Sequence, residues 1–316
     1  MTPNPGPGRI PQTVRWGVLL ALGTALISGA SIFVNGFAVK QLPDPAVYTT
    51  LKNGVAAILL LGLMAATIRP TTIRAIPARS WRRLAVTGIV GGSLPFVLFF
   101  TGLSQASALS AAFIHKTLFI WVAFLAVPFL GERLGLAQLG ALAVLLVGQA
   151  LIVVPAGITW GAGETMIAAA TLLWAVETIV ARRVLRTVPS AVVGAARLGI
   201  GLVVLVGYLA ITGKLGVVAA LGIEQWRWVL LTGALLTGYV ATWFGALQRA
   251  PASLVTAILV LGAPVTAALQ GLGTGATPTI PVLTGDLLVL AAGGVLVVTA
   301  LRRWPLGAQP VPASAS

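Results

Sequence analysis

Apolar positions fill most of the 316-residue chain, in runs that are separated by short polar or basic segments. Each run is roughly 18 or more residues long, enough to cross the ~30 Å hydrocarbon layer of a bilayer as an α-helix. We predict ten such helices, near residues 16–39, 46–68, 82–103, 106–130, 135–154, 164–182, 190–211, 227–248, 251–273 and 284–301. The pattern therefore predicts an all-α integral membrane protein.

The composition agrees with a membrane protein and excludes several kinds of chemistry. Apolar residues make up 58% of the chain and charged residues only 8%, too few for a soluble protein of this length. Because the chain has no cysteine and one histidine, neither thiolates nor a histidine cluster can bind a metal ion. No nucleophile–base pair and no nucleotide-binding loop is recognisable. We expect no enzymatic activity, no metal and no cofactor.

The basic residues indicate how the helices are oriented. In a soluble protein the net charge of +14 would suggest a nucleic-acid partner, but here the basic residues lie between apolar spans, so none is expected. With a cytoplasmic N-terminus, the cytoplasmic segments hold Arg9, Arg15, Arg69, Arg74, Arg79, Arg82, Arg83, Arg133, Arg182, Arg183, Arg186, Arg249, Arg302 and Arg303. The opposite side holds only Lys40, Lys214 and Arg227. The positive-inside rule therefore predicts that both termini are cytoplasmic, which requires an even number of helices.

The two halves of the chain share a pattern at an offset of about 145 residues. Trp81, Arg82, Thr87 and Gly88 all recur at that distance as the same residue types. Each half holds five predicted helices, an odd number, so the second half must cross the membrane in the opposite sense. The expected segments are a disordered N-terminus at 1–14, repeats at 15–155 and 160–302, and a disordered tail at 303–316. Such inverted repeats place a solute site between the halves, near the middle of the membrane.

Several short motifs resemble those of the drug/metabolite transporter superfamily, and specifically of its EamA-type branch. They are ASA at 106–108, LGERL at 130–134 and, in the second half, APAS at 250–253 and APV at 263–265. The resemblance covers about residues 15–302 and implies ten helices in two repeats and a carrier of metabolites or drugs in a prokaryotic cytoplasmic membrane. Within the LGERL motif we expect Glu132 and Arg133 to cap the fourth helix and to set its orientation. The chain departs from the family pattern at Thr277-Pro278 and at His115-Lys116.

Two ionisable residues lie deep in the fourth predicted helix. Lys116 is near the middle of the membrane, where it would bind a carboxylate or phosphate of the solute, or cycle protons, or be held by a backbone carbonyl or a helix end. His115 lies about 100° away around the helix, so both side chains can border one cavity only at its edges. A histidine can exchange protons near neutral pH, or it can be a neutral packing residue. Both residues are candidates for the solute site.

Three further charges lie inside predicted spans. Glu177 is the only acid well inside a helix, and it is expected either to pair with Arg197 of the next helix or to carry protons. Lys52 and Arg197 occupy equivalent positions in the two repeats, near opposite membrane faces. They are expected to border the two entrances of the solute path or to anchor their helices at the interfaces.

Prolines and aromatic residues can shape and line a cavity within the helices. Pro95 and Pro264 fall inside predicted helices and should kink them, which frees carbonyl groups. Aromatic side chains would form apolar walls for an amphipathic solute. The candidates are Phe96, Phe100, Trp121, Trp174, Tyr239 and Trp243, with Trp121 and Trp243 preferred.

These features together favour a carrier over other membrane proteins. We expect secondary-active export or exchange of a small organic metabolite, such as an amino acid or organic anion, by alternating access with proton coupling. The alternative is a flippase or efflux carrier for lipids or drug-like amphipathic solutes. The expected partners are the solute and the lipid bilayer, with a monomer and a homodimer both left open.

Overall fold

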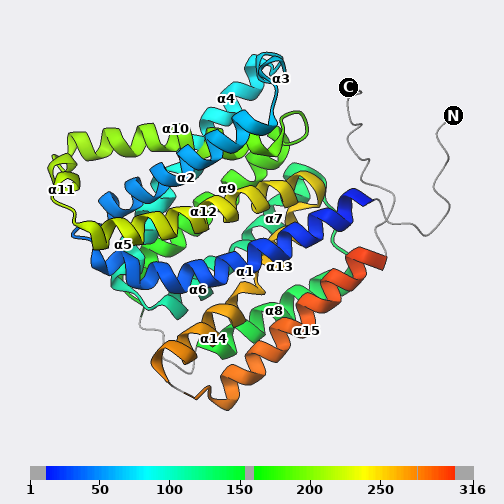
Figure 1. The fold of residues 1–316 in the computed structure, drawn as a ribbon. Helices are drawn as coiled ribbons and strands as arrows, with labels where there is room; N and C mark the ends of the chain where they lie inside the picture. Colours follow the sequence, from blue (N-terminus) through cyan, green and yellow to red (C-terminus); the bar gives the residue numbers. More distant parts are fainter. Residues whose placement is uncertain (1–11, 154–159, 276, 303–316) are drawn as a thin grey trace.

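The computed structural model describes residues 12–153, 160–275 and 277–302, and every regular element within those ranges is helical (Figure 1). The elements are α1 (Gln12–Gln41), α2 (Pro45–Thr67), α3 (Pro70–Arg74), α4 (Ala78–Val86), η1 (Thr87–Gly91), α5 (Leu94–Gln105), α6 (Ala108–Lys116), α7 (Leu118–Leu130), α8 (Leu136–Val153), α9 (Ala162–Val184), α10 (Ser190–Ile211), α11 (Leu215–Ala219), α12 (Ile223–Arg249), α13 (Ala252–Leu259), α14 (Gly262–Thr274) and α15 (Ile280–Arg302). The prediction of an all-α fold is confirmed.

The spans agree with the predicted helices in place and, for the most part, in length. Among the described residues, nine segments are long and apolar enough to cross a membrane: α1, α2, α4 to α5, α6 to α7, α9, α10, α12, α13 to α14, and α15. The fifth predicted helix corresponds to α8, whose apolar stretch Leu136–Ile152 is shorter than these nine. The predicted ends 1–14 and 303–316 lie mostly outside the described residues, but residues 12–14 belong to α1, so the first helix begins earlier than expected.

Two spans are interrupted at matching positions of the two halves. α6 ends at Lys116 and α7 begins at Leu118; between them the hydroxyl group of Thr117 donates a hydrogen bond of 2.7 Å to the carbonyl of Ile114. α13 ends at Leu259 and α14 begins at Gly262. Helix breaks at the membrane centre are a common feature of solute sites in carriers with inverted repeats.

The third span is interrupted in a different way. Its η1 segment is a turn of π-helix that ends at Gly91, and α5 starts after Gly92 and Ser93. The carbonyl groups freed by this break have partners: Trp174 Nε1 donates to the Gly91 carbonyl at 3.1 Å, and Asn53 Nδ2 donates to the Gly92 carbonyl at 3.3 Å. The break is thus held by side chains of α9 and α2.

The two prolines act differently from the prediction. Neither Pro95 nor Pro264 kinks the middle of a continuous helix. Pro95 lies in the first turn of α5 and Pro264 in the first turn of α14, each in the second part of an interrupted span. The physical reason is that the first turn of a helix has no intrahelical acceptor for the missing N–H, so a proline is tolerated there.

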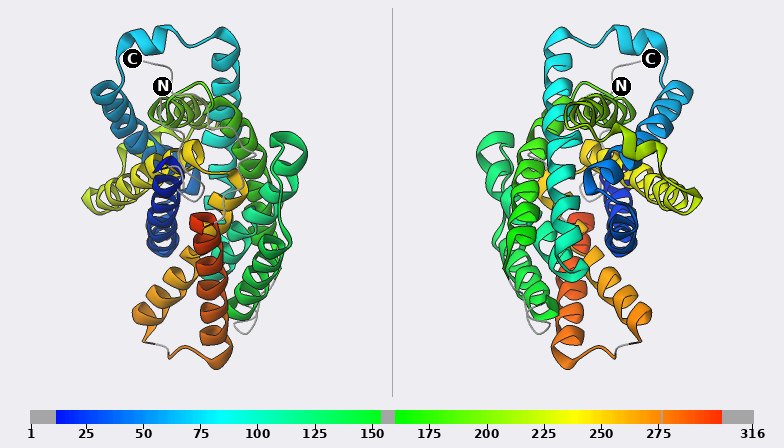
Figure 2. Two further views of the ribbon diagram at one scale, coloured as in Figure 1. Left: turned by 90° about the vertical axis from the view of Figure 1, so that its right-hand side faces the viewer. Right: turned by 90° about the vertical axis from the view of Figure 1, so that its left-hand side faces the viewer.

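Helices from the two halves pack against each other throughout the molecule. α1 lies along α12, α2 contacts α10 and α12, and α5 packs on α9 (Figures 1 and 2). α8 lies beside α15 at the lower end of the view in Figure 1. Gly148 and Gly285 bring these two backbones together, since a Cβ atom on Gly148 would lie 2.9 Å from the Gly285 carbonyl oxygen. α1 begins and α15 ends on the same side of the molecule (Figures 1 and 2).

Candidate solute cavity

A cavity lies between the two halves of the chain. It encloses about 630 Å³ of space that protein atoms do not fill, its open mouth included. Side chains from α1, α2, α5, α6 and α7 form one part of its wall, and side chains from α9, α10 and α12 form the other. The lining contains most of the residues singled out in the sequence: Lys52, Phe96, His115, Glu177, Arg197, Tyr239 and Trp243. Lys116 and Trp121 are not part of it.

Arg197 and Glu177 form a buried ion pair on one wall of the cavity. Arg197 Nε lies 3.3 Å from Glu177 Oε1, and Nη2 donates a long hydrogen bond of 3.5 Å to Oε2. The remaining guanidinium nitrogen, Nη1, is buried and has no hydrogen-bond partner among the described residues. The pair therefore leaves part of the guanidinium group free to bind something else.

The break in the third span makes room for this pair. A Cβ atom on Gly91 would overlap the side chain of Glu177, and one on Gly92 would overlap the backbone carbonyl of Arg197. Only glycine at these two positions lets η1 approach α9 and α10 so closely. The two glycines thus leave the space that Glu177 and the backbone of Arg197 occupy, although neither glycine lines the cavity.

Lys52 lies in the cavity among aromatic rings. Its Nζ is 3.3 Å from the ring centre of Phe100, 5.3 Å from that of Phe96 and 5.4 Å from that of Tyr48. The side chain is buried, and Nζ makes no ion pair or hydrogen bond with any residue that the structure describes. When the amine is protonated, the groups around its charge are the faces of aromatic rings, which attract cations.

The prediction that Lys52 and Arg197 border opposite entrances is wrong. Both are buried in the same cavity, and the Arg197 guanidinium carbon lies 5.2 Å from the ring centre of Phe96, which Lys52 also approaches. The reason is that α2 and α10 pack side by side, so that equivalent positions of the two repeats meet instead of lying apart.

The two neighbouring residues of the fourth span have different surroundings. His115 faces the cavity, where its ring packs edge-on against Phe99 and Trp174, and its buried Nδ1 has no hydrogen-bond partner among the described residues. Lys116 does not line the cavity itself: its Nζ donates a 2.6 Å hydrogen bond to the hydroxyl group of Ser28, which does line it, and lies next to Gly262 at the break before α14. Lys116 therefore links α1 to this break.

Aromatic side chains form much of the remaining wall. Tyr239 and Trp243 of α12 stack with their ring centres 6.0 Å apart, and Phe96 meets Trp174 edge-on at 5.2 Å. Trp121 is 42% exposed on the outside of α7 and does not border the cavity. The position of Trp121 therefore does not support the prediction that it forms part of the cavity wall.

A polar stripe on α1, which was not among the predicted site residues, also borders the cavity. Ser28, Ser31 and Asn35 line the wall, and the Tyr48 hydroxyl group donates a short hydrogen bond to the side-chain carbonyl of Asn35. Their spacing of three and four residues puts them on one face of the helix. That periodicity within an otherwise apolar span was the signal that could have revealed them.

Glu132 joins the two repeats at one end of the bundle. Its carboxylate accepts hydrogen bonds from the backbone N–H of Ala252 at 2.7 Å, from the N–H of Ser253 at 3.1 Å and from the Ser253 hydroxyl group. It thus caps the N-terminus of α13, and the prediction that it caps the fourth helix is wrong. A carboxylate is favourable at a helix N-terminus and unfavourable at a C-terminus, and α7 ends instead at Gly131, in the left-handed conformation with φ 71°.

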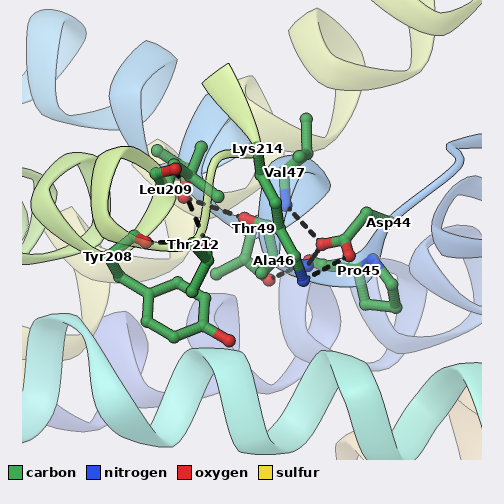
Figure 3. Close-up of polar contacts among 10 residues, drawn as sticks. Asp44, Pro45, Ala46, Val47, Thr49, Tyr208, Leu209, Thr212 and Lys214 are labelled. Atoms are coloured by element: carbon green, nitrogen blue, oxygen red, sulfur yellow. Dashed lines mark hydrogen bonds and ion pairs between the residues drawn. The ribbon is translucent and has the colours of Figure 1, made fainter. Parts of the chain in front are cut away.

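Asp44 and Lys214 join the repeats at the other end of α1 (Figure 3). Lys214 Nζ lies 2.6 Å from Asp44 Oδ2, and Asp44 Oδ1 accepts the N–H groups of Ala46 and Val47 at the start of α2. Burial raises the pKa of Asp44, but the hydrogen bonds from Lys214 and the two backbone amides outweigh it, so the pKa is lowered overall. The hydrogen bond to Asp44 raises the pKa of Lys214.

Comparison with known proteins agrees with this architecture. A stretch of 123 residues is 32% identical to an uncharacterized transporter, YcbK, of Bacillus subtilis (strain 168), and this match covers 38% of the present chain and 39% of that protein. A protein known from a crystal structure shares the fold with a TM-score of 0.69 at 17% sequence identity, over 90% of this chain and 97% of that one. The EamA-like transporter family matches residues 15–154 and again residues 161–300. With one match in each half, the chain belongs to the EamA-like transporter family.

Proposed function

We propose that this transporter is a secondary-active carrier for a small organic solute that bears an anionic group, such as an organic anion or an amino acid. The supporting observation is the excess of positive charge in the cavity. With His115 counted as neutral and Lys52 as protonated, the described lining residues carry two positive charges, on Lys52 and Arg197, and one negative charge, on Glu177. An unpaired buried charge costs several kcal/mol, so a carboxylate or phosphate of the solute is the natural partner.

Both cations lie close to the ring of Phe96. Their charged ends lie 5.3 Å and 5.2 Å from the ring centre of Phe96, for Lys52 Nζ and Arg197 Cζ respectively. Arg197 Nη1 is free to donate, and a guanidinium group binds a planar carboxylate well. We therefore place the solute's anionic group next to Phe96.

The remaining wall suits an apolar or amphipathic body of the solute. Trp174, Tyr239 and Trp243 offer aromatic surface, while Ser28 and Ser31 offer hydroxyl groups. A metabolite with an apolar side chain matches both features.

In this proposal the solute crosses by alternating access. The Glu132 contact with α13 and the Asp44–Lys214 pair join the repeats at the two ends of α1, and each must open in turn. The breaks between α6 and α7 and between α13 and α14 divide the spans into parts that can move separately. Uphill movement would draw on exchange or on protons, with His115 or Glu177 as the proton carrier.

The proposed topology has ten helices, with α8 as the fifth, and both termini in the cytoplasm. Two inverted five-helix repeats require this even count, and the surplus of arginine on one side supports the orientation. The expected location is the cytoplasmic membrane of a prokaryote, where the carrier would export or exchange its solute.

Transport by the reconstituted protein tests this proposal. Liposomes that contain a pH-sensitive dye are supplied with pools of amino acids, carboxylates, nucleosides or cationic drugs, and both dye signal and labelled-solute exchange are recorded. We expect exchange with an anionic or amino-acid pool, lost in Lys52→Met and kept in Lys40→Met, whose lysine is exposed at the end of α1. Activity with the cationic pool alone, or movement only of a labelled lipid, would replace the proposal with the drug or lipid carrier.

A further inference from the structure

The surroundings of Lys52 have the composition of a cation-binding site. The rings of Tyr48, Phe96 and Phe100 surround its Nζ, with the closest ring centre at 3.3 Å. These rings also hold one another in place, since Tyr48 and Phe100 meet edge-on at 5.4 Å and Phe96 and Phe100 stack with centres 6.3 Å apart. We call these three rings the aromatic cage.

Aromatic cages of this kind bind ammonium groups. The negative faces of the rings attract a cation, most strongly where water is excluded, and quaternary ammonium ligands are recognised in this way. Here the ammonium group inside the cage belongs to the protein itself. No carboxylate among the described residues competes for it, because Glu177 is engaged with Arg197.

We infer that Lys52 is a built-in cation that fills an aromatic cation site, and that it thereby keeps organic cations out of the cavity. Lys52 acts in two ways, by occupying the cage and by repelling a second positive charge. The inference rests on the proposed role of the cavity as the solute site. It adds a specificity determinant, since the residue that attracts an anionic solute is also the one that rejects a cationic solute.

Two consequences follow for substitutions of Lys52. Lys52→Ala removes both the charge and the side chain, which leaves an empty cage in a cavity whose other two charges, Arg197 and Glu177, cancel. Lys52→Met removes the charge but fills the cage again with an unbranched side chain of similar length. A small quaternary ammonium ion should therefore bind to Lys52→Ala but not to Lys52→Met.

Equilibrium dialysis of radiolabelled tetramethylammonium against the purified full-length protein tests this inference. We expect Lys52→Ala to bind tetramethylammonium at least about tenfold more tightly than the wild type, Lys52→Met or Lys52→Arg. Adding Phe100→Leu to Lys52→Ala keeps an apolar side chain but removes the closest ring face, and should abolish most of the gain. Lys52→Ser opens the same space, so it gives a second reading if Lys52→Ala does not fold.

Three results would overturn the inference: wild-type protein that binds tetramethylammonium as well as Lys52→Ala, a folded Lys52→Ala protein that gains no binding, or a gain that persists with Phe100→Leu. Folding is judged by a single symmetric peak in size-exclusion chromatography. The assay measures cation binding without transport. A failure of the cage is therefore distinguishable from a failure of the anion-carrier proposal, which is measured by solute exchange in the wild type.

Discussion

Replacing Glu132 by glutamine should open one end of the carrier. The carboxylate of Glu132, at the end of the first repeat's fourth span, caps α13 of the second repeat through Ala252 and Ser253. If this contact closes the end that the proposed topology places in the cytoplasm, weakening it should raise the population in which that end is open. Glutamine has nearly the same shape, so Glu132→Gln removes the charge and replaces one of the two acceptor oxygens by an NH₂ group, which cannot accept a hydrogen bond.

The size of the effect can be worked out from the contacts. A hydrogen bond to a charged group contributes about 1.5–3 kcal/mol, and a neutral one about 0.5–1.5 kcal/mol. The amide contact that the glutamine oxygen keeps should therefore lose about 1 kcal/mol, and the contact that faces the NH₂ group should lose at least about as much. Loss of the negative charge at the helix N-terminus adds about 0.3–1 kcal/mol. Because Glu132 is only partly buried, we take the lower end, about 2 kcal/mol, or about a 30-fold shift in the open-to-closed ratio.

Cysteine labelling measures this ratio without interference, because the chain has no cysteine of its own. Ser31→Cys places a single thiol in the cavity wall. In inside-out vesicles, a membrane-impermeant maleimide reaches this thiol only when the cytoplasmic end is open. The labelling rate follows the open population, so it should rise about 30-fold in Glu132→Gln when the open state is rare in the parent protein, and less when that state is already well populated.

The matched control is Glu224→Gln, which removes an exposed carboxylate. Glu224 pairs with Arg227 within α12, so this contact does not connect the two repeats. Its labelling rate should equal that of the parent protein. An unchanged or slower rate in a normally inserted Glu132→Gln protein would show that the contact does not hold this end closed.

Two other predictions concern residues that do not touch the solute. Gly91→Ala should lower solute exchange at least about tenfold, because the added Cβ would displace Glu177. The control Gly23→Ala, whose Cβ meets no atom within 4 Å, should exchange solute normally. Equal exchange rates in the two variants would contradict the positioning role of Gly91. The Asp44–Lys214 pair should stabilise the protein only while both groups are charged, because the pKa of Asp44 is lowered and that of Lys214 is raised. On the acid side, the pair's contribution to stability is present above the unfolded pKa of Asp44, about 3.9, and is lost as the pH falls through the lowered pKa in the folded protein. On the alkaline side, it is present below the unfolded pKa of Lys214, about 10.4, and is lost as the pH rises through the raised pKa in the folded protein. The difference in Tm between wild type and Asp44→Asn should hence be constant from about pH 5 to 9 and shrink below about pH 4, and a difference that persists undiminished at pH 3 would refute this.

The fold was largely predictable because a bilayer requires long apolar helices, and their lengths and spacing are visible in the sequence. The interruptions were only partly predictable. Pro95 and Pro264 indicated disruption in two spans, and a break lies directly before each of them, but the break at Thr117 has no glycine or proline next to it. The role of Glu132 was missed because its partners lie 120 and 121 residues further along the chain, whereas sequence patterns report neighbours on the same helix.

The candidate site was predictable where charges stand out against an apolar background. His115, Glu177 and Arg197 could be singled out in this way, and all three border the cavity. Which side of a helix faces the cavity depends on tertiary packing, so the sequence did not separate the exposed Trp121 from the cavity-lining Trp243. For the same reason, the depth of a charge in a span did not reveal which partners it would meet.

The central claim is that the cavity carries a solute through its anionic group, and a pair of solutes that differ only in that group tests it most directly. An amino acid that proves to be a substrate and its carboxamide have nearly the same size, but only the first has a carboxylate for Lys52 and Arg197. In liposomes loaded with unlabelled amino acid, the labelled amino acid should exchange rapidly and its labelled carboxamide should not. Exchange of both solutes at similar rates would contradict the claim.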